Sequence, residues 1–185
     1  MARDLLGMRL VHRSKESVTV GIIVEAEAYI GPYDAASHAF RGRTGRNAIM
    51  FGPGGYAYVY FIYGMYYCFN IVTQKAGFPA AVLVRALEPA EGIELMARRR
   101  NTAPADGKIP VNLTNGPGKL CQAMGIDKSL NSADLCGDEL FITTPENPPS
   151  FKVITTPRIN VDYAGEAARY PWRFLIEGNR FVSRR

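Results

Sequence analysis

The chain has 185 residues, 47% of them hydrophobic, and its 22 basic residues exceed its 17 acidic residues by five. This length and apolar content predict one domain over residues 1–185 and exclude a two-domain chain. An odd set of cysteines (Cys68, Cys121 and Cys136) and no recognisable secretory leader favour a reducing compartment and buried, non-catalytic thiols. The two histidines, His12 and His38, have no metal-ligand spacing, so we expect no metal site.

The first predicted elements are a short helix at residues 2–10, a strand, and a turn at residues 14–17. A long strand follows at residues 18–30, where period-two alternation places Glu25, Glu27 and Tyr29 on one face. This face has two interpretations. It is a solvated surface with ordinary acids, or it holds a functional pair whose mutual repulsion leaves one carboxylate suited to accept a proton.

A long connection at residues 31–47 contains His38 and three arginines spaced by glycines, Arg41, Arg43 and Arg46. Long irregular segments in compact domains are often binding loops, so His38 is a ligand candidate as well as a candidate structural histidine. Residues 35–87 contain five basic residues and no acidic one, which equals the charge excess of the whole chain. This pattern favours contacts with phosphates, and the alternative is a solvated arginine surface.

Six of the ten tyrosines lie within residues 56–67. Strands on either side of residues 63–65 predict a β-hairpin with Tyr63 at its tip and Gly64 at positive φ. An aromatic ring at an exposed tip is the shape that can separate stacked bases, and the alternative is a tyrosine ladder in the core. The uncharged stretch at residues 48–74 could span a bilayer, but its Pro53, its glycines and Asn70 fit a buried sheet, so we expect no membrane span.

The second half of the chain predicts a strand at residues 80–87, a helix at residues 88–100 and a surface loop at residues 101–110. Arg85 lies in the apolar strand and needs a carboxylate or phosphate partner, for which Glu27 is a candidate. A short helix is predicted from Gly116 to Gly125, and its first amides and Lys119 could hold a phosphate. Strands are expected at residues 151–155 and 174–176. Together these elements predict an α+β fold, with a mixed, mostly antiparallel curved sheet, flanking short helices and a protruding β-hairpin.

Six blocks of sequence resemble one family along nearly the whole chain. They are VEAEAYIGP at residues 24–32, DAASH at 34–38, YVYFIYGMYYCFN at 58–70, LVRALEP at 83–89, GPGKLC at 116–121 and PRI at 157–159. The chain resembles the alkyladenine (3-methyladenine, methylpurine) DNA glycosylases of the mammalian type. The resemblance implies an enzyme that flips a damaged purine out of duplex DNA and hydrolyses its bond to deoxyribose, leaving an abasic site.

The resemblance also implies roles for individual residues. Glu27 matches the general base that activates water, and Arg85 and the Ile159 carbonyl match groups that hold this water. Tyr63 matches the residue that fills the vacated stack. The remaining matches are the base pocket, formed by Tyr29, His38, Tyr60 and Asn70, with Asn70 opposing the amine of normal guanine. The resemblance and the pattern of basic residues together predict contacts with the DNA backbone from Arg41, Arg43, Arg46 and Lys119.

No lysine occupies a matched catalytic position, so we expect a monofunctional glycosylase without lyase activity, metal or other cofactor. The expected partner is double-stranded DNA with alkylated or deaminated purines, bound by a monomer in the bacterial cytoplasm at the nucleoid. Two other classes remain open from residues alone. One is a non-catalytic nucleic-acid-binding module, and the other is a glycoside hydrolase that uses Glu25 and Glu27 as its carboxylate pair.

Overall fold

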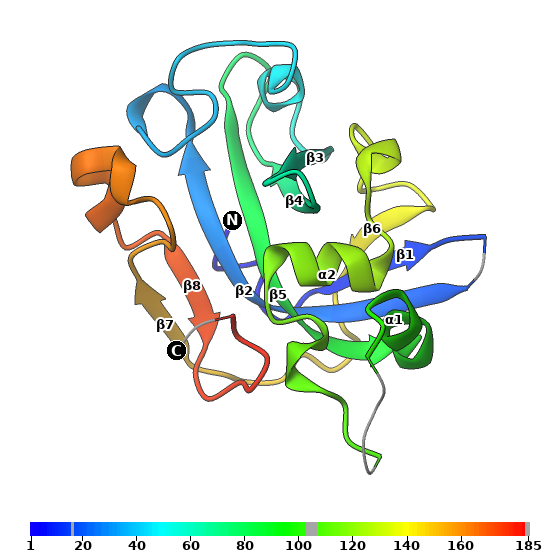
Figure 1. Ribbon diagram of the computed structural model, residues 1–185. Helices are drawn as coiled ribbons and strands as arrows, with labels where there is room; N and C mark the ends of the chain where they lie inside the picture. The colour runs from blue at the N-terminus through cyan, green and yellow to red at the C-terminus, as the bar shows by residue number, and fades with distance from the viewer. Residues whose placement is uncertain (16, 103–106, 184–185) are drawn as a thin grey trace.

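The computed structural model describes residues 1–15, 17–102 and 107–183. Residue 16 of the predicted turn and residues 103–106 of the predicted loop lie outside these ranges. The described strands form one curled sheet (Figure 1). They are β1 (Arg9–Arg13), β2 (Val18–Ile30), β3 (Ala57–Ile62), β4 (Tyr66–Val72), β5 (Ala80–Glu91), β6 (Leu140–Thr143), β7 (Val153–Thr156) and β8 (Arg173–Ile176).

The strand order is β3-β4-β5-β2-β1-β6, and β8 pairs with both β2 and β7. Every pairing among these strands is antiparallel. The predicted α+β class with a mostly antiparallel sheet and short helices is therefore confirmed. The long central strands β2 and β5 pair along most of their length, so side chains from both can meet in the middle of the sheet.

Two α-helices, α1 (Ile93–Arg99) and α2 (Pro117–Met124), lie next to each other over the sheet (Figure 1). Helix α2 packs on β4 and β5, and its buried Leu120 and Met124 join the main hydrophobic core. Its first residue is proline, which needs no hydrogen-bond partner there, and Gly125 ends it in the left-handed conformation at φ 73°. The predicted helix between Gly116 and Gly125 is confirmed.

Five short 3-10 helices complete the regular structure of the described residues. They are η1 (Gly31–Tyr33), η2 (Ala48–Phe51), η3 (Val111–Leu113), η4 (Lys128–Leu130) and η5 (Asp162–Arg169). Element η5 is held by a small apolar cluster in which Val161, Ala164 and Ala167 pack with Ala36. This packing places η5 beside the loop that follows β2. In the part of the chain that the structure describes, no helix is both long and apolar enough to cross a membrane.

Strands β3 and β4 are joined by residues 63–65 in a hairpin, with Ile62 paired to Tyr66. Gly64 has φ 68°, as predicted, and Tyr63 has φ 54°, which is unusual for a residue with a side chain. Tyr63 is 73% exposed. The hairpin therefore presents a large ring to solvent.

Two predicted helical segments are wrong. Residues 2–7 form turns, because the backbone of Gly7 and Met8 bonds to Ile23 of β2 and leads directly into β1. Residues 88–91 continue β5, with Glu88 opposite Ile22, and α1 begins only after Gly92 at φ 71°. In both places, pairing with β2 overrides the local helix signal.

The prediction that all three cysteines are buried is also wrong. Cys68 and Cys121 are buried, but Cys136 is exposed. Cys68 differs from the other two because it lines the cavity described below. Burial raises the pKa of its thiol, so this side chain stays protonated near neutral pH.

Candidate active site

A cavity of about 340 Å³ lies between the β3–β4 hairpin, the central strands and the segment that follows β7. Its lining includes all four residues predicted for a base pocket, which are Tyr29, His38, Tyr60 and Asn70. It also includes Tyr63, Arg85 and Ile159. Residues predicted from five separate blocks of sequence therefore converge on one cavity.

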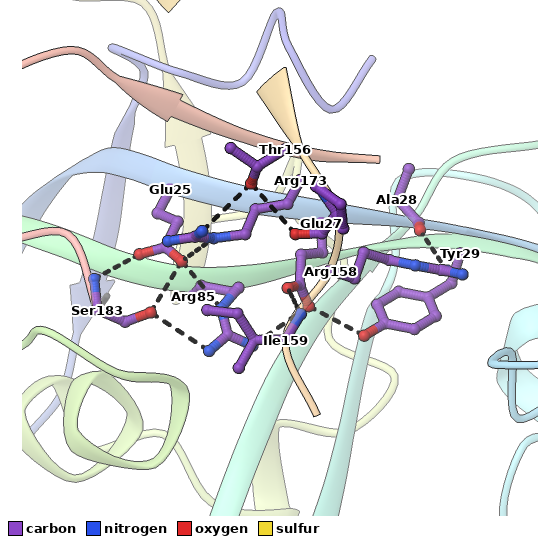
Figure 2. Close-up of polar contacts among 11 residues, drawn as sticks. Glu25, Glu27, Ala28, Tyr29, Arg85, Thr156, Arg158, Ile159, Arg173 and Ser183 are labelled. Carbon is purple, nitrogen blue, oxygen red and sulfur yellow. Dashed lines mark hydrogen bonds and ion pairs between the residues drawn. The ribbon is translucent and has the colours of Figure 1, made fainter. Parts of the chain in front are cut away.

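Glu27 lies directly behind this lining and is completely buried. Its Oε2 accepts hydrogen bonds from the Tyr29 hydroxyl at 2.9 Å and from Arg85 Nη1 at 3.2 Å, and its Oε1 accepts one from the Ile159 amide at 2.8 Å (Figure 2). All three donors line the cavity. A carboxylate offers about four acceptor positions, so these contacts leave room for roughly one further donor such as water.

The local structure of β2 and β5 explains how Arg85 reaches Glu27. The pairing register shifts between Ile23 and Glu25 and shifts back between Glu25 and Ala26, where Ala26 pairs with Val84 and skips Arg85. Such irregularities redirect side chains near functional sites. The interpretation of Glu25 and Glu27 as ordinary surface acids is wrong, since both are fully buried. The predicted contact between Arg85 and Glu27 is confirmed.

The charges in this network stabilise one another. Burial opposes the charge of Arg85, but Glu27 and Glu25 outweigh it and raise the pKa of the guanidinium. Burial and the neighbouring Glu27 raise the pKa of Tyr29 well above its ordinary value. Tyr29 therefore remains a hydrogen-bond donor, and Arg85 remains a cation, over the whole physiological pH range.

Arg158 anchors the segment that carries Ile159. Its guanidinium forms two hydrogen bonds to Asp34, at 2.5 and 2.8 Å, and a third to the Ala28 carbonyl at 2.9 Å. The side chains of Arg158 and Asp34 are both completely buried. The Arg158 guanidinium also lies 4.6 Å from the centre of the Tyr29 ring. This arrangement holds together β2, the loop after β2 and the Ile159 amide that contacts Glu27.

The opposite side of the cavity is aromatic. His38 Nδ1 lies 2.9 Å from the Tyr58 hydroxyl, and the His38 ring meets the Tyr60 ring edge to face at 4.6 Å between centroids. Burial raises the pKa of Tyr58 to about 12. Partial burial and the charge of Arg46 lower the pKa of His38, so its imidazole is neutral at pH 7.

The four predicted DNA-backbone residues have different environments. Arg41 and Arg43 are exposed. Arg46 donates to the Phe61 carbonyl at 2.9 Å and lies over the Tyr60 ring, so it connects the segment at residues 31–47 to the hairpin. Lys119 Nζ donates to Asn115 Oδ1 at 2.8 Å, close to Pro117 and Gly118 of the cavity lining.

Several lining residues have no role predicted from the sequence. Tyr58 and Tyr66 of the tyrosine-rich hairpin are two of them, and both line the cavity. Tyr163, which is 72% exposed, and Asn160, at φ 59°, come from the segment after β7 and had no recognisable motif. The described residues contain no group of three His, Cys, Asp or Glu side chains placed to hold a metal ion.

Comparisons with known proteins agree with this geometry. The family model described as methylpurine-DNA glycosylase (MPG) matches residues 1–180. A relative from Alkaliphilus oremlandii is 53% identical over all of this chain and 93% of its own length. Relatives from Desulfitobacterium hafniense and Clostridium acetobutylicum are 48% and 49% identical, each over 99% of this chain and 92% and 91% of their own lengths. All three carry the provisional name 3-methyladenine DNA glycosylase.

These matches run through every block that surrounds the cavity, and they exclude both a non-catalytic module and a glycoside hydrolase as the class of this protein. The chain belongs to the methylpurine-DNA glycosylase family, and it is a DNA-repair hydrolase that acts on the N-glycosidic bond.

Proposed function

We propose that this enzyme flips a damaged purine out of duplex DNA into the cavity and hydrolyses its N-glycosidic bond with a water molecule that Glu27 activates. The observation that supports this proposal best is the placement of a buried carboxylate directly behind an aromatic cavity, held by Tyr29, Arg85 and the Ile159 amide. The cavity volume of about 340 Å³ is in the range of small-ligand sites.

The proposed base pocket uses Tyr29, His38 and Tyr60 as ring faces and edges around the purine. A neutral His38 carries one N–H, and if Tyr58 donates to Nδ1, the Nε2–H is free to bond the base. Asn70 donates through Nδ2 to the Tyr58 carbonyl at 3.0 Å, which fixes its amide beside the cavity. We propose that this fixed amide opposes the exocyclic amine of normal guanine.

The proposed reaction begins when a water molecule takes the remaining acceptor position of Glu27, which is completely buried in the free enzyme. Glu27 takes a proton from this water as the oxygen attacks C1′, and the purine departs with the electrons of the N-glycosidic bond. Arg85 and the Ile159 carbonyl hold the water. Alkylated purines carry positive charge and leave readily, whereas hypoxanthine must also be protonated. Cationic alkylpurines are therefore the expected preferred substrates.

A direct assay uses duplex oligonucleotides with 7-methylguanine, hypoxanthine or ethenoadenine, analysed with and without hot alkali. We expect the enzyme to release the base without alkali and the strand to break only after alkali. No lysine is among the lining residues of the described cavity, so we expect no lyase activity. A Glu27→Gln preparation purified in parallel controls for host glycosylases. Failure to release any of these bases, or strand cleavage without alkali, would contradict the proposal of a monofunctional glycosylase.

Tyr63 is proposed to fill the space that the flipped base leaves in the duplex. Tyr63→Ala should reduce excision from duplex DNA by about 5- to 150-fold, because stacking of a base on an aromatic ring contributes about 1–3 kcal/mol. Single-stranded DNA has no base stack for Tyr63 to fill, so the excision rate on this substrate should fall less in Tyr63→Ala. Tyr33→Ala is a matched control, since Tyr33 is 74% exposed and lies outside the cavity lining. Equal losses on both substrates would argue against the wedge role.

A further inference from the structure

Glu25 is a second buried carboxylate, two residues from Glu27, to which the proposed reaction gives no role. It is completely buried, and its Oε1 accepts hydrogen bonds from Arg85 Nε at 3.0 Å and Arg173 Nε at 2.8 Å. Ser183 adds two more, from its hydroxyl to Oε1 at 2.8 Å and from its amide to Oε2 at 2.5 Å (Figure 2). Three of these four donors share Oε1 and one bonds Oε2, so their number equals the roughly four bonds that a carboxylate accepts.

The two carboxylates therefore differ in what they can do. Glu27 accepts from three donors, all of which line the cavity, whereas Glu25 accepts from four donors, of which only Arg85 lines it. Arg85 joins the two carboxylates, since Nε bonds Glu25 and Nη1 bonds Glu27. Its third nitrogen, Nη2, donates to the Ser183 hydroxyl at 3.2 Å. The orientation of Arg85 toward Glu27 is thus set from the Glu25 side.

We propose that Glu25 is a positioning residue for the reaction, which holds Arg85 against Glu27 and joins the C-terminal segment at Ser183 to the active site. This inference rests on the proposed role of Glu27 as the base. Glu25 acts in two ways. It fixes the Arg85 guanidinium, and its negative charge balances Arg85 and Arg173 so that Glu27 keeps the basicity needed to accept a proton.

The charged and titratable groups around Glu27 determine the direction in which loss of the Glu25 charge affects Glu27. They are Glu25 and Tyr29 on β2, Cys68 on β4, Arg85 on β5, Arg158 beside Ile159, and Arg173, which pairs opposite Glu27 on β8. Removal of the Glu25 charge leaves an excess of positive charge, which favours the ionised form of Glu27. The charged carboxylate of Glu27 is then stabilised by the surplus positive charge and accepts a proton from water less readily.

The test is single-turnover excision of 7-methylguanine, whose cationic base needs no further proton, measured against pH. Glu25→Gln should slow excision about tenfold and move the acidic limb of the pH–rate profile about one unit lower, with unchanged affinity for the substrate DNA. Ser183→Ala removes hydrogen bonds but no charge, so a smaller rate loss without movement of the limb is expected. Glu177→Gln, an exposed acid paired to Lys152, is the matched control.

The double variant Glu25→Gln/Arg173→Met restores the charge balance and should return the limb toward its wild-type position, which a purely structural role would not do. A wild-type pH profile in Glu25→Gln, or a rate loss with no movement of the limb, would overturn the inference. If Glu27→Gln excises as well as wild type, the proposed function fails and the inference fails with it. If Glu27→Gln is inactive and Glu25→Gln behaves as wild type, only the inference on Glu25 fails.

Discussion

Glu27→Gln is expected to reduce single-turnover excision of 7-methylguanine by about 10²- to 10⁴-fold, the usual contribution of a general base. The amide is nearly isosteric with the carboxylate but does not accept a proton from water at neutral pH. Binding of lesion-containing DNA should persist, because the aromatic lining and the basic residues are unchanged. The loss should therefore appear in the rate at saturating enzyme and not in the dissociation constant.

The controls separate chemistry from folding. Glu27 accepts from Arg85 and the Ile159 amide, so the melting temperature of the variant must be measured beside its activity. Glu177→Gln makes the same chemical change at an exposed site and should excise normally. Activity of Glu27→Gln within a fewfold of wild type would show that another group activates the water.

Arg158→Met is expected to have the largest effect on stability. It removes one partner of a fully buried ion pair and leaves the Asp34 carboxylate without its counterion. Loss of one partner from such a pair typically costs about 3–5 kcal/mol. For a chain of this size, that corresponds to a fall in melting temperature of about 6–20 °C, which calorimetry or thermal circular dichroism can measure.

Two further variants test whether the stability loss of Arg158→Met comes from the buried charge that is left without a partner. Lys152→Met breaks the exposed pair with Glu177 and should change the melting temperature little, because solvent screens such pairs. Arg158→Met/Asp34→Leu removes both buried charges and should recover part of the loss. A wild-type melting temperature for Arg158→Met would mean that this ion pair does not anchor the Ile159 segment.

The elements that the sequence predicted well have strong local patterns. The strand at residues 18–30 alternates clearly, the hairpin strands flank Gly64, and the helix before Gly125 has both end signals. The missed elements depend on contacts distant in sequence. Acids at residues 88–91 resemble a helix start, but their backbone pairs with β2, and this pairing is not visible in the local pattern.

In the candidate site, too, the features with local sequence motifs were predicted, and those that depend on contacts distant in sequence were not. The resemblance predicted roles for Glu27, Arg85, Tyr63 and the pocket residues, and the fold brings all of these except Glu27 to the lining of one cavity, with Glu27 directly behind it. It did not identify the burial of Glu25 or the Arg158–Asp34 pair, since these three residues come from β2, the loop after it and the segment after β7. Arg46 also could not be placed from the sequence, because its contacts are a carbonyl and a ring on the distant hairpin.

The proposed function requires a damaged purine to leave the duplex and enter the cavity in front of Glu27. A crystal structure of Glu27→Gln bound to duplex DNA with a stable lesion such as ethenoadenine would show where that base lies. The base should lie among Tyr29, His38 and Tyr60, with Tyr63 in the vacated stack and C1′ facing position 27. A lesion still stacked in the duplex, or a C1′ facing a different carboxylate, would contradict the account.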